Sequence, residues 1–186
     1  MRKTFLSNLL IALIFASSSL AEFQINTGTN DNQANPAIAA DANGNFVVVW
    51  NSYFGGVRSN EIFGRCFGAD GSPIGSEFQI NTTTSGNQKE SSVAMDAAGN
   101  FVVVWYGPGV SQEDIFGRRF DLNGRPLGDE FSINSRTESK QQCPKVAMNA
   151  AGAFAVAWES DKLGTKPYEW VISCRLYDAN GLAVGQ

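Results

Sequence analysis

The chain of 186 residues contains no histidine. Histidine is the usual general base near neutral pH and a frequent metal ligand. Its absence excludes catalytic triads that use a histidine and zinc sites with histidine ligands. Three cysteines are present, and no two of them have the Cys-x-x-Cys spacing of redox or metal motifs. We therefore expect no metal and no cofactor.

Charged residues are also few, at 17% of the chain, and Lys and Arg form no basic run. Nucleic acids and anionic membranes are bound by clustered Lys and Arg. Nucleic acids and anionic membrane surfaces are therefore not expected as partners.

Long apolar runs are absent apart from the segment 9–15 near the N-terminus. Arg2 and Lys3 precede this run, and small residues around Ala21 follow it, as in a secretory signal peptide. The run is well short of the roughly 20 residues of a membrane span. The sequence predicts a signal peptide over 1–21 and a secreted, periplasmic or cell-surface protein, with no membrane insertion after cleavage. Cleavage would leave 12 basic against 18 acidic residues, a net charge of −6.

An oxidising compartment permits disulfides, and the cysteines are Cys66, Cys143 and Cys174. Three cysteines leave at least one unpaired. We expect buried small side chains or a single incidental disulfide, and the sequence leaves the pairing open.

The chain contains a motif in three copies, at 41–50, 96–105 and 149–158. The second copy reads Asp-Ala-Ala-Gly-Asn-Phe-Val-Val-Val-Trp, and the copies end at Trp50, Trp105 and Trp158. Such a period indicates a repeat architecture. The predicted repeats span 22–76, 77–129 and 130–186. Each of them opens with Glu-Phe-x-Ile-Asn, where x is Gln in the first two repeats and Ser in the third.

Each repeat is predicted to contain four short strands and no helix. The opening strand alternates apolar and polar residues. A small-residue strand, the Phe-Val-Val-Val-Trp strand and a fourth strand follow, with Asx-Gly or similar turns between them. The Trp strand is apolar at every position, so both of its faces must be covered. An all-β fold of four-stranded antiparallel, β-propeller-like blades meets that need. A β-trefoil or β-prism is the alternative.

The patterns Glu-Phe-x-Ile-Asn, Met-Asp-Ala-x-Gly-Asn-Phe-Val-Val-Val-Trp and Ile-Phe-Gly-Arg-Arg-Phe-Asp-x-x-Gly resemble a tandem repeat of large exported bacterial surface proteins. The resemblance covers residues 22–186. It implies propeller-like blades and an extracellular setting, and it brings no catalytic residues. The third repeat departs from the pattern at Asn149, Ala153, Ala155 and Ala157.

Three blades are fewer than the four to eight that propellers typically hold. One hypothesis is that 22–26 of one chain forms the outer strand of the last blade of another, so that self-association closes a six-bladed ring. The alternative is an open arc from a longer protein.

The loops of the repeats carry amides and aromatic residues, which suit neutral sugars through hydrogen bonds and apolar stacking. The candidate ligand-binding residues are Tyr53, Tyr106, Tyr168, Trp170, Gln33 and Gln88, with Asn30, Asn32, Asn87 and Gln141 in the same loops. By contrast, the three repeated Trp residues are expected in the core, and Arg65, Arg118 and Arg175 recur at one position and are expected to be structural. The adjacent acids Glu113-Asp114 and Asp129-Glu130 are expected to be solvated.

These features favour an exported, non-enzymatic binding or interaction module, for carbohydrate or a cell-surface partner such as a glycan or protein. Two alternatives stay open. One is a glycoside hydrolase of the propeller class, and the other is a structural segment or remnant of a larger surface repeat protein.

Overall fold

The computed structural model describes residues 22–28, 32–54, 59–162 and 169–185, which form three four-stranded antiparallel sheets. Blade 1 contains β1 (Asn32–Ala40), β2 (Phe46–Phe54), β3 (Ser59–Phe67) and β4 (Pro73–Gln79). Blade 2 contains β5 (Lys89–Met95), β6 (Phe101–Pro108), β7 (Glu113–Phe120) and β8 (Phe131–Ser132). Blade 3 contains β9 (Gln141–Met148), β10 (Phe154–Asp161), β11 (Trp170–Tyr177) and β12 (Ala183–Val184). The predicted all-β, propeller-like class is confirmed.

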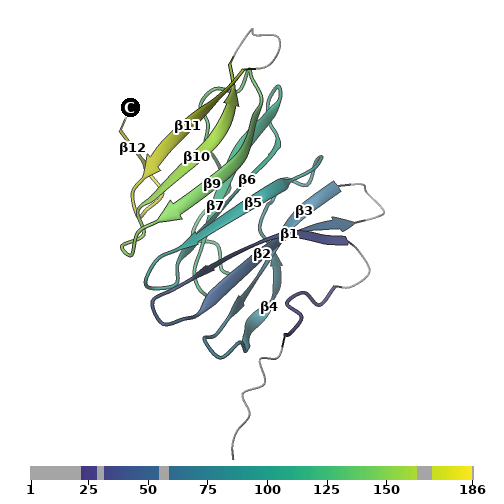
Figure 1. Cartoon of the computed structure of the whole chain (residues 1–186), viewed down its shortest axis with the longest axis vertical. Coiled ribbons are helices and arrows are strands. Elements are labelled where there is room, and N and C mark those ends of the chain that lie inside the picture. Colours follow the sequence, from purple (N-terminus) through teal and green to yellow (C-terminus); the bar gives the residue numbers. More distant parts are fainter. Residues whose placement is uncertain (1–21, 29–31, 55–58, 163–168, 186) are drawn as a thin grey trace, which may run out of the picture.

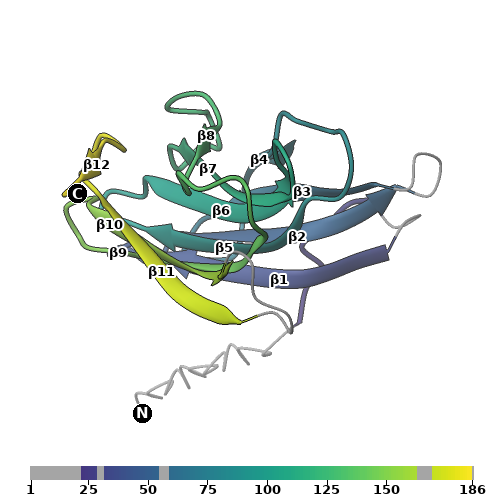
Figure 2. The same ribbon diagram turned by 90° about the horizontal axis from the view of Figure 1, so that it is seen from above.

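The small-residue strands β1, β5 and β9 are the innermost strands of the three blades (Figure 1). The backbone N–H of Val146 in β9 donates to the Ser92 hydroxyl in β5 at 3.3 Å, so these two strands lie side by side. In Figure 2 the outer strands β4, β8 and β12 lie along the opposite side of the stack from β1. Small side chains therefore occupy the crowded inner edge, as the sequence predicts.

Blade 2 is covered on both faces, and its Trp strand β6 divides its side chains between two cores. Val103 and Trp105 pack in the core shared with blade 1, whereas Val102 and Val104 pack in the core shared with blade 3. All four side chains are fully buried. Each such burial stabilises the fold by roughly 1.5–3 kcal/mol. A blade alone could bury neither of these sets, which is why the repeats fold together.

The blades are offset from the sequence repeats by part of the outer strand. Phe78 and Gln79, which open the second repeat, pair with β3 and so complete blade 1. Phe131 and Ser132, which open the third repeat, likewise complete blade 2. In blade 3 the outer strand β12 has two residues. The opening segment 22–26 was predicted to be a strand, but it is not paired as one in this structure.

An asparagine fixes each completed outer strand. The Asn81 Oδ1 accepts a hydrogen bond from the Ile62 N–H at 2.8 Å, and the Asn134 Oδ1 accepts one from the Ile115 N–H at 2.7 Å. The Asn134 Nδ2 donates to Asp114 at 2.7 Å. The prediction that Asp114 is solvated is therefore wrong, since its side chain is 3% exposed and holds this anchor.

The other paired acids differ in their surroundings. Glu113 forms a partly exposed ion pair with Lys140 at 2.9 Å. Glu130 accepts hydrogen bonds from the backbone N–H and hydroxyl of Thr82 at 2.8 and 3.0 Å, and Asp129 is exposed. These acids lie on the surface, as expected.

The repeated tryptophans are buried, as predicted, and two of them are held by a glutamine. The Trp105 Nε1 donates to the Gln88 Oε1 at 3.0 Å, and the Trp158 Nε1 donates to the Gln141 Oε1 at 2.8 Å. Both glutamines are 1% exposed. An indole N–H buried without an acceptor would be costly, so these amides stabilise the cores.

The recurring arginines also bind the backbone, which agrees with the structural role predicted for them. Arg118 Nη1 donates to the Ile80 carbonyl at 3.0 Å, and Arg175 Nη1 donates to the Ile133 carbonyl at 2.6 Å. Each arginine thus ties its own blade to the outer strand of the preceding blade.

The Asp-x-x-Gly turns are hairpin turns. The Asp96 Oδ1 accepts hydrogen bonds from the N–H groups of Ala98 and Asn100 at 2.9 Å, and Gly99 has a φ of 90°. Among the described residues no cluster of acidic or cysteine side chains could hold a metal ion. Likewise, no helix in the described part of the chain is long and apolar enough to cross a membrane. Cys66, Cys143 and Cys174 are free thiols.

We predict that Gln88→Leu lowers the free energy of unfolding by about 1–3 kcal/mol, because the Trp105 N–H loses its acceptor inside the core. Urea unfolding followed by tryptophan fluorescence measures the change. The matched control is Gln112→Leu, at an exposed position, which should change the stability little. Equal stabilities of the two variants would contradict a structural role for the Gln88 amide.

Candidate functional site

Each innermost strand contains a β-bulge near the end where the Trp strands end. The bulges place Asn35, Glu90 and Cys143 at positive φ values of 53°, 48° and 54°. Each lies two residues after Gln33, Gln88 or Gln141. A left-handed conformation costs such residues roughly 1–2 kcal/mol and is found where the chain must aim a side chain, often at a ligand site. This end of the inner strands is therefore the candidate site.

The first cleft lies at this end, between blades 1 and 2, and has a volume of about 400 Å³. Residues of β1, β2, β3 and β5 form its wall. They are Asn32, Ala34, Asn35, Asn51, Tyr53, Asn60, Lys89 and Glu90. The cleft thus surrounds one aromatic ring with four side-chain amides, and it also holds one cationic and one anionic group.

Asn51 is the most buried of these amides, at 5% exposure. Its Nδ2 donates to the Gln88 carbonyl at 2.8 Å, which fixes the side chain across the blade interface. Its Oδ1 has no hydrogen-bond partner among the described residues. A buried acceptor without a partner costs about 1–3 kcal/mol. The Oδ1 is thus a fixed, unpaired acceptor within the wall of the first cleft.

Burial, aided by nearby carboxylates, raises the pKa of two groups next to the first cleft. Burial raises the pKa of the Cys143 thiol to about 12, and hydrogen bonding to Glu90 and Glu159 and their charges add to the effect. Burial also raises the pKa of Tyr106 to about 12, with contributions from Glu90 and Glu113. At neutral pH both groups are therefore uncharged, and Cys143 is a poor nucleophile.

A second cleft, of about 390 Å³, lies between blades 2 and 3. Its wall is formed by Gln112, Glu113, Glu138, Ser139, Lys140, Asp161 and Trp170. Asp161 is 9% exposed, and its Oδ1 has no partner among the described residues. Trp170 is 39% exposed. Acidic side chains outnumber the amides here, so this cleft differs in charge from the first.

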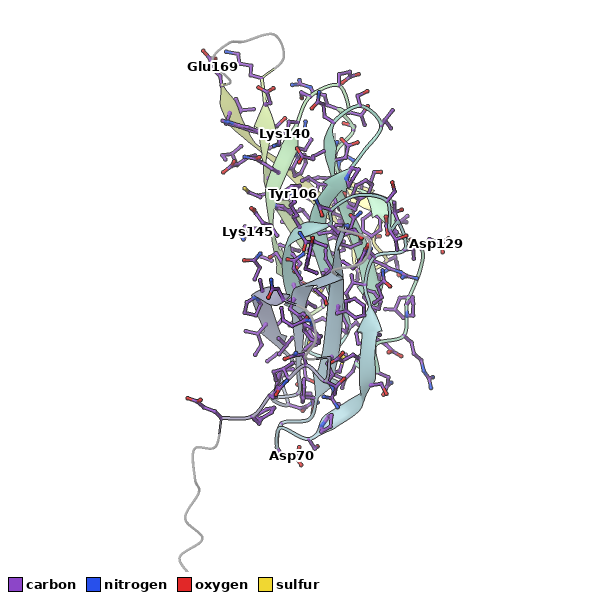
Figure 3. The ribbon with its side chains drawn as sticks, turned by 90° about the vertical axis from the view of Figure 1, so that its right-hand side faces the viewer. Asp70, Tyr106, Asp129, Lys140, Lys145 and Glu169 are labelled. Atoms are coloured by element: carbon purple, nitrogen blue, oxygen red, sulfur yellow. The ribbon has the colours of Figure 1, made fainter. Side chains whose placement is uncertain are left out.

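The structure separates the residues predicted from the sequence. Tyr53 lines the first cleft and Trp170 the second. Tyr106 is buried at 8% exposure, within the stack (Figure 3). Gln88 is in the core, bound to Trp105, and Gln33 Nε2 donates to the Ser52 hydroxyl at 3.0 Å. Tyr168 and Asn30 lie outside the described residues.

Sequence reasoning missed most of the wall of the first cleft, namely Asn35, Asn51, Asn60, Lys89 and Glu90. One signal was available for Asn51. The residue directly after the repeated Trp is Asn51, Tyr106 or Glu159 in the three copies, so this position varies beside an invariant core residue. When the residue type varies at one position of a repeat, packing in the core is not the only factor that determines which residue stands there.

Comparison with known proteins identifies the fold. No family model and no curated protein matches this chain. A Hadza microbial sialidase matches with a TM-score of 0.60 at 12% identity, over 81% of this chain and 36% of that one. An endo-1,4-β-xylanase from Bacteroides thetaiotaomicron matches with a TM-score of 0.53 at 11% identity, over 85% and 60%. An endo-arabinase from the same organism matches with a TM-score of 0.51 at 12% identity, over 81% and 58%.

The chain therefore spans less than two thirds of the length of each of these proteins. At 11–12% identity the likeness carries no residue from one protein to another. The chain is thus an all-β protein with three blades of a propeller-like fold.

Proposed function

We propose that this protein is an exported carbohydrate-binding module, and that a neutral oligosaccharide binds in the first cleft. The observation that carries the proposal is the Asn51 Oδ1, a buried acceptor without a protein partner in a cleft that also contains Tyr53. A sugar hydroxyl can donate to that oxygen. The apolar face of a sugar ring can stack on the tyrosine ring.

The other amides of the first cleft suit the same class of ligand. Asn32, Asn35 and Asn60 each offer a donor and an acceptor, and neighbouring sugar hydroxyls need both. Asn35 is exposed, and its positive φ fixes the direction from which its side chain leaves the strand. Lys89 and Glu90 oppose each other in charge, so the cleft has no strong preference for a charged ligand.

Two further observations support this proposal. The solved structures with the same fold include proteins named as a sialidase, an endo-arabinase and an endo-1,4-β-xylanase, so the fold is one that carbohydrate-active proteins use. Residues 1–21 have the basic start, apolar run and small residues of a signal peptide, which predicts export. Polysaccharides are available outside the cell.

We predict that the protein is retarded in affinity electrophoresis by a neutral polysaccharide such as arabinan or xylan, and that Tyr53→Ala reduces the association constant at least tenfold. The loss follows from the removal of the stacking surface. The matched control is Trp170→Ala in the second cleft, which should leave the retardation unchanged. No retardation by any polymer of a panel of neutral polysaccharides would reject the proposal, as would equal effects of the two substitutions.

A glycoside hydrolase is a second candidate, because Glu90 places a carboxylate in the first cleft at a strained backbone position. Glycoside hydrolysis commonly needs two carboxyl groups, one on each side of the bond. Glu90 is the single carboxylate among the described residues of that wall. Binding without turnover is therefore the better supported function.

Assays of the same polymers for reducing sugar distinguish the two candidates. We expect no release above the level of a Glu90→Gln variant, and we expect that variant to retain polysaccharide binding. Release that depends on Glu90 would establish the hydrolase and contradict the non-enzymatic function.

A further inference from the structure

Blades 1 and 2 show how this fold accepts an outer strand. In blade 1 the Ile80 N–H donates to the Ile62 carbonyl at 2.8 Å, and in blade 2 the Ile133 N–H donates to the Ile115 carbonyl at 2.8 Å. The asparagine that follows each donor accepts from the same isoleucine N–H, at 2.8 Å from Ile62 and 2.7 Å from Ile115. The acceptor site is therefore an isoleucine in the third strand with both backbone groups directed outward.

Blade 3 has the same acceptor site without an occupant among the described residues. Ile172 in β11 corresponds to Ile62 and Ile115, and β12 pairs only with Leu176 and Tyr177. Ile172 is 74% exposed, whereas its two counterparts are fully buried. A groove of about 770 Å³ runs along β11, with Val171, Cys174, Arg175 and Val184 among its lining residues. The edge of β11 is thus open where the other blades hold their outer strand.

The chain also contains a third strand donor, Phe23-Gln24-Ile25-Asn26, which has the sequence pattern of Phe78–Asn81. This segment lies against blade 1, just as the segment that ends at Asn81 lies against blade 2 and the segment that ends at Asn134 lies against blade 3. Arg65 Nη1 donates to the Ile25 carbonyl at 3.0 Å, just as Arg118 binds the Ile80 carbonyl. The Thr27 N–H donates to Glu77, just as the Thr82 N–H donates to Glu130.

The donor is already arranged for pairing. Asn26 Nδ2 donates to the carbonyl two residues ahead at 2.6 Å, and the same bond forms at Asn81 and Asn134, at 3.0 and 2.7 Å. In those two the Oδ1 then binds the third strand. Phe23 remains 54% exposed. Binding would therefore cost little ordering of the segment.

The outer face of blade 1 is apolar in the same way. Val48, Trp50 and Phe67 form a core cluster there. Ile38 beside it is 65% exposed, whereas its counterpart in blade 2, Val93, is 8% exposed because blade 1 covers it. The two ends of the stack thus expose positions that the inner blade interfaces bury.

We propose that two copies of this chain bind each other, with Phe23–Asn26 of each copy forming the outer strand of blade 3 in the other. The Ile25 N–H would donate to the Ile172 carbonyl and the Ile172 N–H to the Asn26 Oδ1, as in blades 1 and 2. Blade 3 of each copy then covers blade 1 of its partner, and a two-fold axis relates the two contacts. The product is a closed ring of six blades, within the usual range for propellers.

The side chain of Cys174 weakens this contact between the two copies. It replaces Gly64 and Gly117, where an added Cβ would lie 3.1 to 3.3 Å from the isoleucine and phenylalanine of the outer strand. A cysteine at this place narrows the groove, so Cys174→Gly should strengthen the association. Because Cys174 is exposed in the single chain, the bound strand should also protect its thiol from alkylation.

The test is light scattering of the exported protein over a dilution series. We expect twice the monomer mass, with dissociation on dilution. Ile172→Asp should abolish the dimer, since it places a charge in the contact, and it should leave the monomer folded because the side chain is exposed. The matched control is Val110→Asp, at 85% exposure in blade 2, which should leave the dimer intact.

Two further variants test whether the dimer forms through this particular contact. Asn26→Ala should weaken the dimer at least tenfold, and Cys174→Gly should strengthen it. A monomer at every concentration would overturn the proposal. So would a dimer that Ile172→Asp does not affect, or an open-ended series of higher masses in place of a closed ring. Polysaccharide binding by a monomer would leave the proposed function standing while this inference fails.

Discussion

The constraint on which the structure depends is that a blade cannot cover its own faces or complete its own edge. The Trp strand of blade 2 directs fully buried side chains into two cores, and each core is supplied from the other side by a neighbouring blade. The fourth strand is completed by the next repeat and is fixed by one asparagine, such as Asn134, which binds both the Ile115 N–H and Asp114. Folding of one repeat is therefore coupled to its neighbours, as in other repeat proteins.

Much of this fold could be predicted from the sequence, because its signals are repeated. The uninterrupted apolar residues of 101–105 require two covered faces, and the small residues of 92–95 fit an inner strand. The offset between repeats and blades was part of the hypothesis that an opening segment completes another blade. The role of Asp114 could not be predicted in this way. The pair Glu113-Asp114 reads as two surface charges, and only the pairing of β7 with the following segment shows that Asp114 is 3% exposed and binds an asparagine.

The candidate site was less accessible to prediction, since it depends on bulges and on contacts across blades. Gln88 was selected as an exposed loop amide, yet its side chain completes the hydrogen bonding of a buried tryptophan. The bulge two residues later aims Glu90 toward the first cleft, and its positive φ is not encoded by a glycine that could have revealed it. Tyr53 was found because an aromatic residue in a polar loop is a signal in the residue type itself.

The residue directly after the repeated Trp explains why the clefts between the blades differ in chemistry. The residue after the repeated Trp faces the next blade, and it is Asn51 in blade 1, Tyr106 in blade 2 and Glu159 in blade 3. An amide leaves an acceptor in the first cleft, whereas the buried tyrosine fills the corresponding space between blades 2 and 3. In blade 3, Glu159 at this position accepts a hydrogen bond from Gln142 Nε2 at 2.9 Å, so each of the three blades carries a different chemistry after its tryptophan.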